Sequence, residues 1–287
     1  ACRWSKCLGC NLPSKCSKFH VKYDAIKNQI DYLFSLPEVS SQREKITKLI
    51  ISNNGSVLDE DTFSSTTLIY LMMKANINFP HLAMACIETR PEYVDQEELW
   101  FLKRVANEGD TPTNIEIAFG FEVFDDKIRN EQLMKGLDLA EFERVVAMIA
   151  PFKFNVKCYL MQKPVPGMSD EAAILDVQKS IKYLAAVANR YNVKMNAHLN
   201  PTYAAYGTQL EKAFYRGEFT PPRLRDVAKA VLAAEGTGLS VFIGLFDEGL
   251  AVEGGSFLRP GDEKVVELLQ RFNTRQNHDI LRDVLEL

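Results

Sequence analysis

The sequence predicts an α/β protein, a partial (β/α)6-type TIM barrel of six strand–helix units with a C-terminal extension. Short apolar runs rich in β-branched residues alternate with longer segments of helical periodicity almost to the end of the chain. Polar residues follow these runs, as they do at the carboxyl ends of parallel barrel strands, where barrel enzymes gather their chemistry. Together the two patterns predict a parallel sheet with a functional site at one edge.

The strands are predicted at the apolar runs, whose composition suits a sheet covered by helices. They are 46–52, 82–87, 114–119, 154–161, 193–199 and 239–245. Helices are predicted at 21–35, 62–75, 95–107, 139–149, 170–190, 221–235 and 262–273. The helix at 170–190 carries a stripe at helical spacing that we expect to be buried, formed by Ile174, Val177, Ile181, Leu184 and Ala188.

Length and composition favour a single enzyme domain. With 287 residues and 46% hydrophobic content, the chain can bury a large core, and α/β barrels reach this size undivided. We expect a barrel core over 1–200 and an extension over 201–287 packed on the same domain. No apolar run approaches the roughly 20 residues that span a bilayer, and no signal peptide precedes Cys2, so we expect a cytoplasmic protein without membrane contact. The net charge of −4 gives no general nucleic-acid signature.

Three of the six cysteines lie in the first ten residues. Cys7 and Cys10 form a C-x-x-C pair, and Cys2 lies just upstream. Sulfurs at this spacing can reach one centre, and such crowding is more typical of metal ligands in a reducing compartment than of extracellular disulfides. A structural zinc or a ferredoxin-type cluster uses four protein ligands, so three cysteines predict a metal centre with one open position.

Other cysteine chemistries remain open at this point. Cys16 or His20 can supply a fourth ligand, which gives a closed zinc site and a noncatalytic, zinc-stabilised binding protein. A fully ligated cluster gives an electron carrier, and a thioredoxin-like redox pair requires a compact βαβ unit. Cys86 and Cys158 lie within apolar strands, where we expect small buried hydrophobes and no metal.

The residues after each predicted strand are unusually polar. They form the segments 52–56, 88–92, 120–122 with Asp125 and Asp126, 162–164, 198–201 and 246–248. Each segment alone is compatible with an ordinary turn. Six of them together with the cysteine-rich segment predict a cofactor site.

The cysteines and the order of the motifs resemble the radical S-adenosylmethionine superfamily. The usual cysteine pattern is C-x3-C-x2-C, and the longer C-x4-C-x2-C of this chain is similar to branches related to the Elongator catalytic subunit. Within them the sequence resembles the archaeosine-lyase radical SAM family over nearly its whole length. The matching segments are NNGSVLD at 53–59, IETRPEYV at 87–94, FGFEVFDDKIRNEQLMKGL at 119–137, KCYLMQKP at 157–164 and the segment 200–224.

The resemblance implies a 4Fe–4S cluster held by Cys2, Cys7 and Cys10, with S-adenosylmethionine on its open iron. Reductive cleavage of that cofactor gives a 5′-deoxyadenosyl radical that abstracts hydrogen from a substrate, and a flavodoxin or ferredoxin supplies the electron. The net reaction is of lyase or transferase type, and no catalytic residue is assigned. The family also places a strand before the cysteines. Because this chain starts at Ala1, either a segment has been removed or the barrel is short and open.

The family pattern further implies ten cofactor contacts: Asn53, Asn54, Gly55, Ser56, Glu88, Arg90, Glu122, Lys163, His198 and Asn200. The turn 53–56 matches the place that contacts the methionine amino group, although the usual Gly-Gly-Glu form is absent. Glu122, ahead of Asp125 and Asp126, suits the ribose hydroxyls, since a carboxylate accepts hydrogen bonds from both.

The remaining contacts have alternatives. Glu88 and Arg90 can instead form a local ion pair. Lys163 suits the methionine carboxylate, and its alternatives are a substrate anchor or a solvated lysine. His198 and Asn200 suit adenine or ribose, although a lone histidine at a strand end is more often structural.

The substrate class also follows from the resemblance. The archaeosine-lyase branch acts on a lysine-modified deazaguanine in transfer RNA, which implies a tRNA-modification enzyme. Basic and aromatic residues interleave over 212–225, a pattern that can stack bases or follow phosphates, whereas the acidic balance argues against extensive RNA contact. A radical SAM enzyme for a small molecule or a peptide is the alternative.

Overall fold

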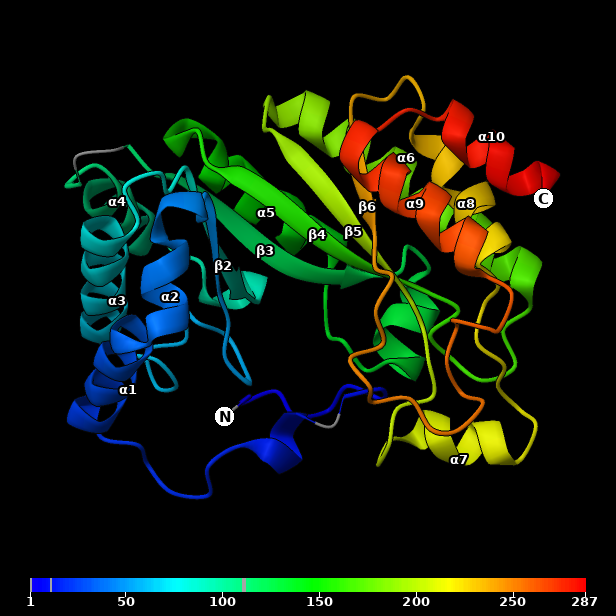
Figure 1. Cartoon of the computed structure of the whole chain (residues 1–287), viewed down its shortest axis with the longest axis horizontal. Helices are drawn as coiled ribbons and strands as arrows, with labels where there is room; N and C mark the ends of the chain where they lie inside the picture. Colours follow the sequence, from blue (N-terminus) through cyan, green and yellow to red (C-terminus); the bar gives the residue numbers. More distant parts are fainter. Residues whose placement is uncertain (1, 11, 110–111) are drawn as a thin grey trace. The chain divides into compact units, whose positions relative to one another are not determined.

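The chain folds into a parallel six-stranded sheet that forms half of a barrel, with strand order β1-β2-β3-β4-β5-β6 (Figure 1). The structure is a computed structural model that describes residues 2–10, 12–109 and 112–287. The strands are β1 (Lys48–Ile51), β2 (Met84–Thr89), β3 (Asn114–Glu122), β4 (Asn155–Gln162), β5 (Met195–Pro201) and β6 (Ser240–Ile243). The predicted fold class and all six predicted strands are therefore confirmed.

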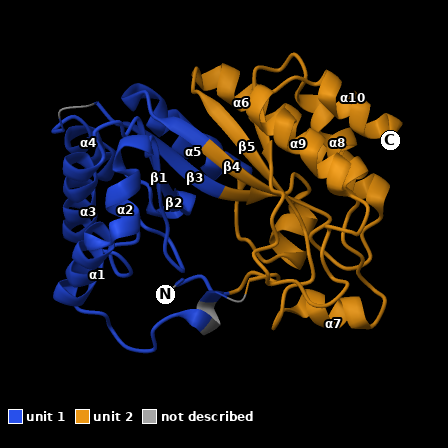
Figure 2. Ribbon diagram, viewed as in Figure 1, with its two compact units in different colours: residues 1–5, 12–119, 139–156 blue, residues 6–11, 120–138, 157–287 orange. Residues whose placement is uncertain are grey.

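The chain divides into two compact units (Figure 2). Unit 1 comprises Ala1–Ser5, Leu12–Phe119 and Leu139–Val156, and unit 2 comprises Lys6–Asn11, Gly120–Asp138 and Lys157–Leu287. The predicted division at residue 200 stays a prediction.

Unit 1 pairs β1, β2 and β3 with five helices. These are α1 (Tyr23–Ser35), α2 (Pro37–Gln42), α3 (Ser65–Asn78), α4 (Gln96–Ala106) and α5 (Leu139–Ile149). Side-chain caps begin two of them, because Ser64 accepts a hydrogen bond from the Thr67 N–H and Asp95 from the Glu98 N–H. Helices α1 and α3 share an apolar cluster in which the Phe34 and Phe79 rings lie 5.3 Å apart.

Unit 2 contains β5, β6, most of β4 and five further helices. These are α6 (Asp170–Tyr191), α7 (Gln209–Tyr215), α8 (Leu224–Val231), α9 (Glu263–Arg275) and α10 (Asp279–Glu286). Helix α6 packs on β5 and α8, and α9 packs on β6 and α10. The predicted apolar stripe of α6 is buried at Ile174, Val177, Ile181 and Leu184, whereas Ala188 is partly exposed.

Short tight turns link these elements. Five are 3-10 turns, Leu12–Lys15, Arg43–Lys45, Pro91–Tyr93, Ala150–Phe152 and Leu232–Ala234, and one is a π-helical turn, Lys127–Gln132. All seven predicted helices are present, and α2, α7 and α10 are additional. No helix in the part of the chain that the structure describes is long and apolar enough to cross a bilayer.

Candidate functional site

Cys7 and Cys10 lie in a tight backbone turn of unit 2. The Cys10 N–H donates to the Cys7 carbonyl oxygen at 3.2 Å. Between them, the Leu8 N–H donates to the Leu133 carbonyl oxygen at 3.0 Å, and the Leu8 side chain packs against the buried cluster of Val123, Leu133 and Val165. The turn is thus anchored at its centre, and both cysteines are at least partly exposed to solvent.

Cys2 is a free, partly exposed thiol of unit 1. The Ser5 N–H donates to the Cys2 sulfur at 3.5 Å, and the Ser5 hydroxyl donates to the Cys2 carbonyl. Within 2–10, 12–109 and 112–287, no three His, Cys, Asp or Glu side chains are gathered closely enough to hold a metal ion. The predicted cysteine triad therefore stays a prediction carried by its sequence spacing and thiol chemistry.

The remaining cysteines have other surroundings. The Cys16 thiol donates to the Leu12 carbonyl at 3.3 Å and to the Asn54 carbonyl at 3.8 Å, and His20 is exposed. Cys86 and Cys158 are fully buried, as predicted, and burial raises the pKa of the Cys158 thiol far above its usual range. A protonated, buried thiol behaves as a small hydrophobe.

The turn 53–56 lies against the end of β2 within unit 1. The Val57 N–H donates to the Glu88 carbonyl at 2.9 Å, and the Arg90 N–H donates to the buried Ser56 hydroxyl at 3.2 Å. These bonds bring two of the predicted cofactor-binding segments together. They come from different strand ends, as expected for a parallel sheet.

Asn53 in this turn carries an unsatisfied polar atom. Its amide nitrogen donates to the Ser56 carbonyl at 3.4 Å, while its amide oxygen is buried and has no hydrogen-bond partner among the residues that the structure describes. A buried acceptor without a donor costs about 1–3 kcal/mol. A bound group with an N–H or O–H donor removes this cost, so the turn fits a ligand such as an ammonium group.

Arg90 is almost fully buried, and its guanidinium has two defined neighbours. It lies 4.6 Å from the centre of the Trp4 ring, and its Nε donates to Glu92. Stacking on an aromatic face and a carboxylate partner fix the planar guanidinium in one orientation. Arg90 therefore links the end of β2 to Trp4, two residues after Cys2.

Glu122 ends β3 in unit 2 and pairs with Lys135, whose ammonium lies 2.8 Å from Glu122 Oε1. Glu122 adopts a left-handed conformation, with φ of 68°. A Cβ at Gly120 would lie 2.2 Å from the Lys135 ammonium and 2.3 Å from Glu122 Oε1. Glycine at position 120 is therefore what allows this ion pair to cross the strand.

The loop that carries Lys135 is organised by Arg129, which is fully buried. Its guanidinium donates to the carbonyls of Val123, Phe124 and Leu137 at 2.8 to 3.1 Å and to the Asp126 carboxylate at 2.7 Å. Burial lowers the pKa of Arg129. Since Leu133 of the same loop accepts the bond from Leu8, the Arg129 network also supports the cysteine turn.

The two aspartates that follow β3 have structural partners. Asp126 pairs with Arg129, and the Asp125 carboxylate accepts from the Ile128 N–H at 2.9 Å. The Asp125 N–H in turn donates to Asp176 of α6 at 2.8 Å. Burial raises the pKa of Asp176. Glu122 has a protein partner as well, in Lys135, so the preference for Glu122 over the two aspartates stays a prediction.

Lys163 follows β4 and is buried rather than solvated. Its ammonium donates to Asp170 at 2.6 Å and to the Thr220 hydroxyl at 2.9 Å. An ammonium has three N–H donors, so one remains for a further acceptor. The role of Lys163 in cofactor binding stays a prediction, and only this one N–H is left to serve it.

His198 and Asn200 lie on the same face of β5, because strand residues alternate between faces. A Cβ at Gly244, next to the end of β6, would lie 2.7 Å from Asn200 Oδ1 and 3.3 Å from His198 Nε2. The His198 ring also lies 5.7 Å from the Tyr159 ring. The structure therefore brings these two predicted residues together beside Gly244.

Two residues that the sequence did not single out lie next to them. Gln162 ends β4 with its side chain fully buried, and Thr202 follows β5. The Thr202 N–H donates to the Gln162 carbonyl at 3.2 Å. The Gln162 amide and the Thr202 hydroxyl have no partners among the described residues. Gln162 lies in the predicted strand-end segment 162–164, and Thr202 directly follows the segment 198–201. That their side chains lack partners depends on tertiary packing, which no local pattern reveals.

Comparison with known proteins relates the chain to archaeal proteins. It is 25% identical over 236 residues to archaeosine synthase subunit beta of Methanosarcina acetivorans, covering 82% of this chain and 64% of that protein. It is 23% identical to the protein of that name from Thermococcus kodakarensis, covering 80% and 66%, and 22% identical to an uncharacterised protein of Methanocaldococcus jannaschii, covering 96% and 73%. The chain thus spans less than two thirds of both archaeosine synthase subunits.

Among solved structures, the fold is similar to that of the archaeal Elp3 of Methanocaldococcus infernus with its N-terminal residues 1–46 deleted. The TM-score is 0.59 at 18% identity, over 88% of this chain and 59% of that one. No family model matches the sequence. The relation to archaeosine synthase and to an Elongator-like fold, which the motifs predict, is therefore supported.

Proposed function

We propose that this chain is a radical S-adenosylmethionine enzyme that modifies a nucleoside of transfer RNA. The observation that supports the proposal is the anchored turn that carries both Cys7 and Cys10, in a chain related to archaeosine synthase subunits. Two thiols on one turn with a third a few residues upstream suit an iron–sulfur cluster. The radical SAM family members that the motifs resemble use this donor set.

The cofactor set consists of a 4Fe–4S cluster on Cys2, Cys7 and Cys10 together with S-adenosylmethionine. When bound, they supply a 5′-deoxyadenosyl radical that abstracts hydrogen from the substrate. A low-potential protein such as flavodoxin or ferredoxin is the proposed reductant.

The chain's own polar groups bind and orient the cofactor. The unsatisfied amide oxygen of Asn53 accepts from the methionine ammonium, and Asn54, Gly55 and Ser56 complete that turn. Lys163 offers its third N–H to the methionine carboxylate, and Glu122 offers its second oxygen to the ribose hydroxyls. Glu88, Arg90, His198 and Asn200 are the further proposed contacts.

A transfer-RNA substrate is supported by the names of two relatives and by the surface of unit 2. Tyr215 at the end of α7 is 65% exposed, beside the exposed Lys212 and Arg216. Aromatic rings and cations together suit stacked bases and phosphates.

Anaerobic reconstitution with iron, sulfide and a reductant tests the proposal. We expect a brown protein that forms 5′-deoxyadenosine from S-adenosylmethionine, and transfer of deuterium from labelled tRNA into that product. Cys7→Ser abolishes both cluster binding and product formation. Cys16→Ser is the matched control and keeps them, because its thiol bonds to two backbone carbonyls.

Other results would redirect the proposal. Stoichiometric zinc in fresh protein, with no 5′-deoxyadenosine, would instead identify a zinc-stabilised binding protein. Deuterium transfer from metabolite pools but not from tRNA would point to a small-molecule substrate.

A further inference from the structure

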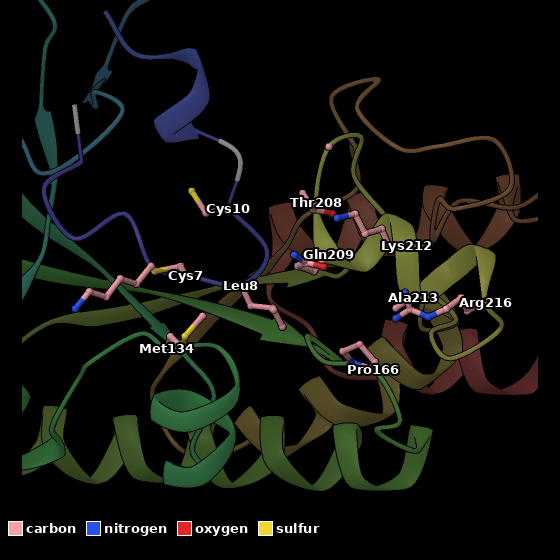
Figure 3. Close-up of a pocket in the computed structure, with 12 residues that line it drawn as sticks. Cys7, Leu8, Cys10, Met134, Pro166, Thr208, Gln209, Lys212, Ala213 and Arg216 are labelled. Carbon is pink, nitrogen blue, oxygen red and sulfur yellow. The ribbon is translucent and has the colours of Figure 1, made fainter. Parts of the chain in front are cut away.

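A cavity of about 550 Å³ opens beside the cysteine turn within unit 2 (Figure 3). Its lining has three cationic side chains and no aspartate or glutamate. The lining residues are Lys6, Cys7, Leu8, Cys10, Met134, Pro166, Gly207, Thr208, Gln209, Lys212, Ala213 and Arg216. A volume in this range suits a small-molecule group, and the charge of the lining favours an anion.

Helix α7 and its two capping residues form one wall of this cavity. Gln209, Lys212 and Arg216 recur three and four residues apart, so they share one face of the helix and its end. Thr208 caps the helix by accepting from the Glu211 N–H at 3.3 Å. A Cβ at Gly9 would lie 3.8 Å from Leu210, so α7 lies directly against the cysteine turn.

Arg216 is held in a fixed orientation. Its Nε and Nη2 donate to the two carboxylate oxygens of Glu218 at 2.9 and 2.6 Å. The Glu218 backbone is fixed as well, because its N–H donates to the Ala213 carbonyl and its carbonyl accepts from Gly167. Nη1 makes no hydrogen bond to the described residues. A guanidinium oriented in this way keeps a donor for an incoming oxygen.

Lys212 adds a second cation to the same helix face. Its side chain is exposed, and its ammonium forms no ion pair within the described ranges. Lys163, the lysine that the sequence favoured for a carboxylate, is largely occupied by Asp170 and Thr220. Lys212 and Arg216 thus bring two cations to one wall of the cavity.

We propose that this cavity binds an anionic oxygen group of the substrate, a phosphate or a carboxylate, through Lys212 and Arg216. The inference deepens the proposed function, because it assigns Lys212 and Arg216 to one anionic group in a defined cavity, and it rests on that function in calling the ligand a substrate. An anion held there lies next to the cysteine turn. The cavity thus fixes one end of the substrate by charge-assisted hydrogen bonds.

Equilibrium binding to the full chain tests the site without cluster or cofactor. Inorganic phosphate, acetate, guanosine 5′-monophosphate and guanosine are titrated at constant ionic strength, and binding is followed by calorimetry. We expect saturable phosphate or acetate binding that weakens at least about fivefold in Lys212→Ala and in Arg216→Ala, since each variant removes a charge-assisted hydrogen bond. Lys229→Ala removes an exposed lysine of α8 outside the cavity and leaves the affinity unchanged.

The probes also separate the two sources of the anion. Tighter binding of phosphate and of the nucleotide than of acetate and guanosine identifies a phosphate site, and preference for acetate identifies a carboxylate site. The proposal is overturned if the anions bind the unaltered chain, Lys212→Ala and Arg216→Ala with equal affinity. It is also overturned if Lys229→Ala weakens anion binding as much as those two variants do. Anion binding without 5′-deoxyadenosine formation would contradict only the proposed function.

Discussion

The turn 53–56 in unit 1 and the strand-end charges of unit 2 differ in how far the protein satisfies them. Asn53 keeps a buried amide oxygen without a partner, whereas Glu122 and Lys163 each have a partner within hydrogen-bond distance. All three follow strands and look alike in sequence. Polar strand ends are thus of two kinds: a waiting kind, which has a buried polar atom without a protein partner, and a built-in kind, whose polar atoms already have protein partners.

The two kinds respond differently to substitution. A residue with protein partners contributes to folding, because its loss leaves those partners unsatisfied. A residue with an unsatisfied atom costs folding energy and contributes only when a ligand is present. Measuring both the free energy of unfolding and the ligand affinity of the same variants therefore shows to which of the two kinds each site residue belongs.

Arg129→Met should have the largest effect and tests the built-in kind. It removes a buried guanidinium that donates to the carbonyls of Val123, Phe124 and Leu137, of which Leu137 keeps a second donor in Asn130, so we expect a loss of about 3 kcal/mol or more in the free energy of unfolding. Urea denaturation measures it. Arg104→Met is the control, because this side chain is 82% exposed. A loss below about 1 kcal/mol would show that the loop after β3 does not depend on Arg129.

Asn53→Ala tests the waiting kind. We expect the free energy of unfolding to change by less than about 0.5 kcal/mol, because the lost amide oxygen has no partner to abandon. Affinity of the reconstituted protein for S-adenosylmethionine should fall about tenfold. The exposed neighbour provides the control Ser52→Ala. A large loss of stability with unchanged affinity would assign Asn53 to the built-in kind.

His278 tests whether a buried atom without a partner always marks a ligand site, because it lies away from the strand ends. We expect a small effect on the pH dependence of stability. The Nε2 of His278 is buried without a partner among the described residues. Burial lowers the pKa of His278 below 6.5 and Arg282 lowers it further, whereas the negative charges of Glu235 and Asp279 partly oppose this shift. The unfolded chain then binds the proton more readily, so stability is fully present above about pH 6.5 and falls as the pH drops below it.

Thermal unfolding between pH 7.5 and 5.5 measures this dependence. We expect His278→Gln to flatten the decline, and the exposed His20→Gln to leave it as it was. An unchanged decline in His278→Gln would remove His278 as its cause. The flattening would show that an unsatisfied buried atom can destabilise a fold without marking a ligand site.

The sequence was sufficient for the sheet and insufficient for most partners of the site. Apolar runs locate all six strands, and the pattern is strongest in β3 and β4, which are buried along most of their length, whereas β1 and β6 are partly exposed. Helix α7 was missed since it has only seven residues, although Thr208 and Glu211 resemble a capping box. The partner of Lys163 at Thr220 lies 57 residues away and follows only from tertiary packing.

For the candidate cofactor-binding residues, the sequence likewise predicted where they lie along the chain but not which partners their polar atoms have. The strand-end pattern and the family resemblance singled out Asn53 and Glu122, but nothing local distinguishes the unsatisfied amide from the paired carboxylate. Gln162 was within a predicted strand-end segment, and only its burial makes it a candidate. Local patterns predict where polar groups lie, and packing determines what they can still bind.

Gly120 makes three positions of the chain interdependent. The Glu122–Lys135 pair passes over its α-carbon, so any side chain at 120 must displace both charged groups. Both are ends of flexible side chains and can move. During sequence divergence, an alanine at position 120 therefore requires that the side chains of both residue 122 and residue 135 turn away or shorten, and the ion pair keeps this position only while residue 120 is glycine.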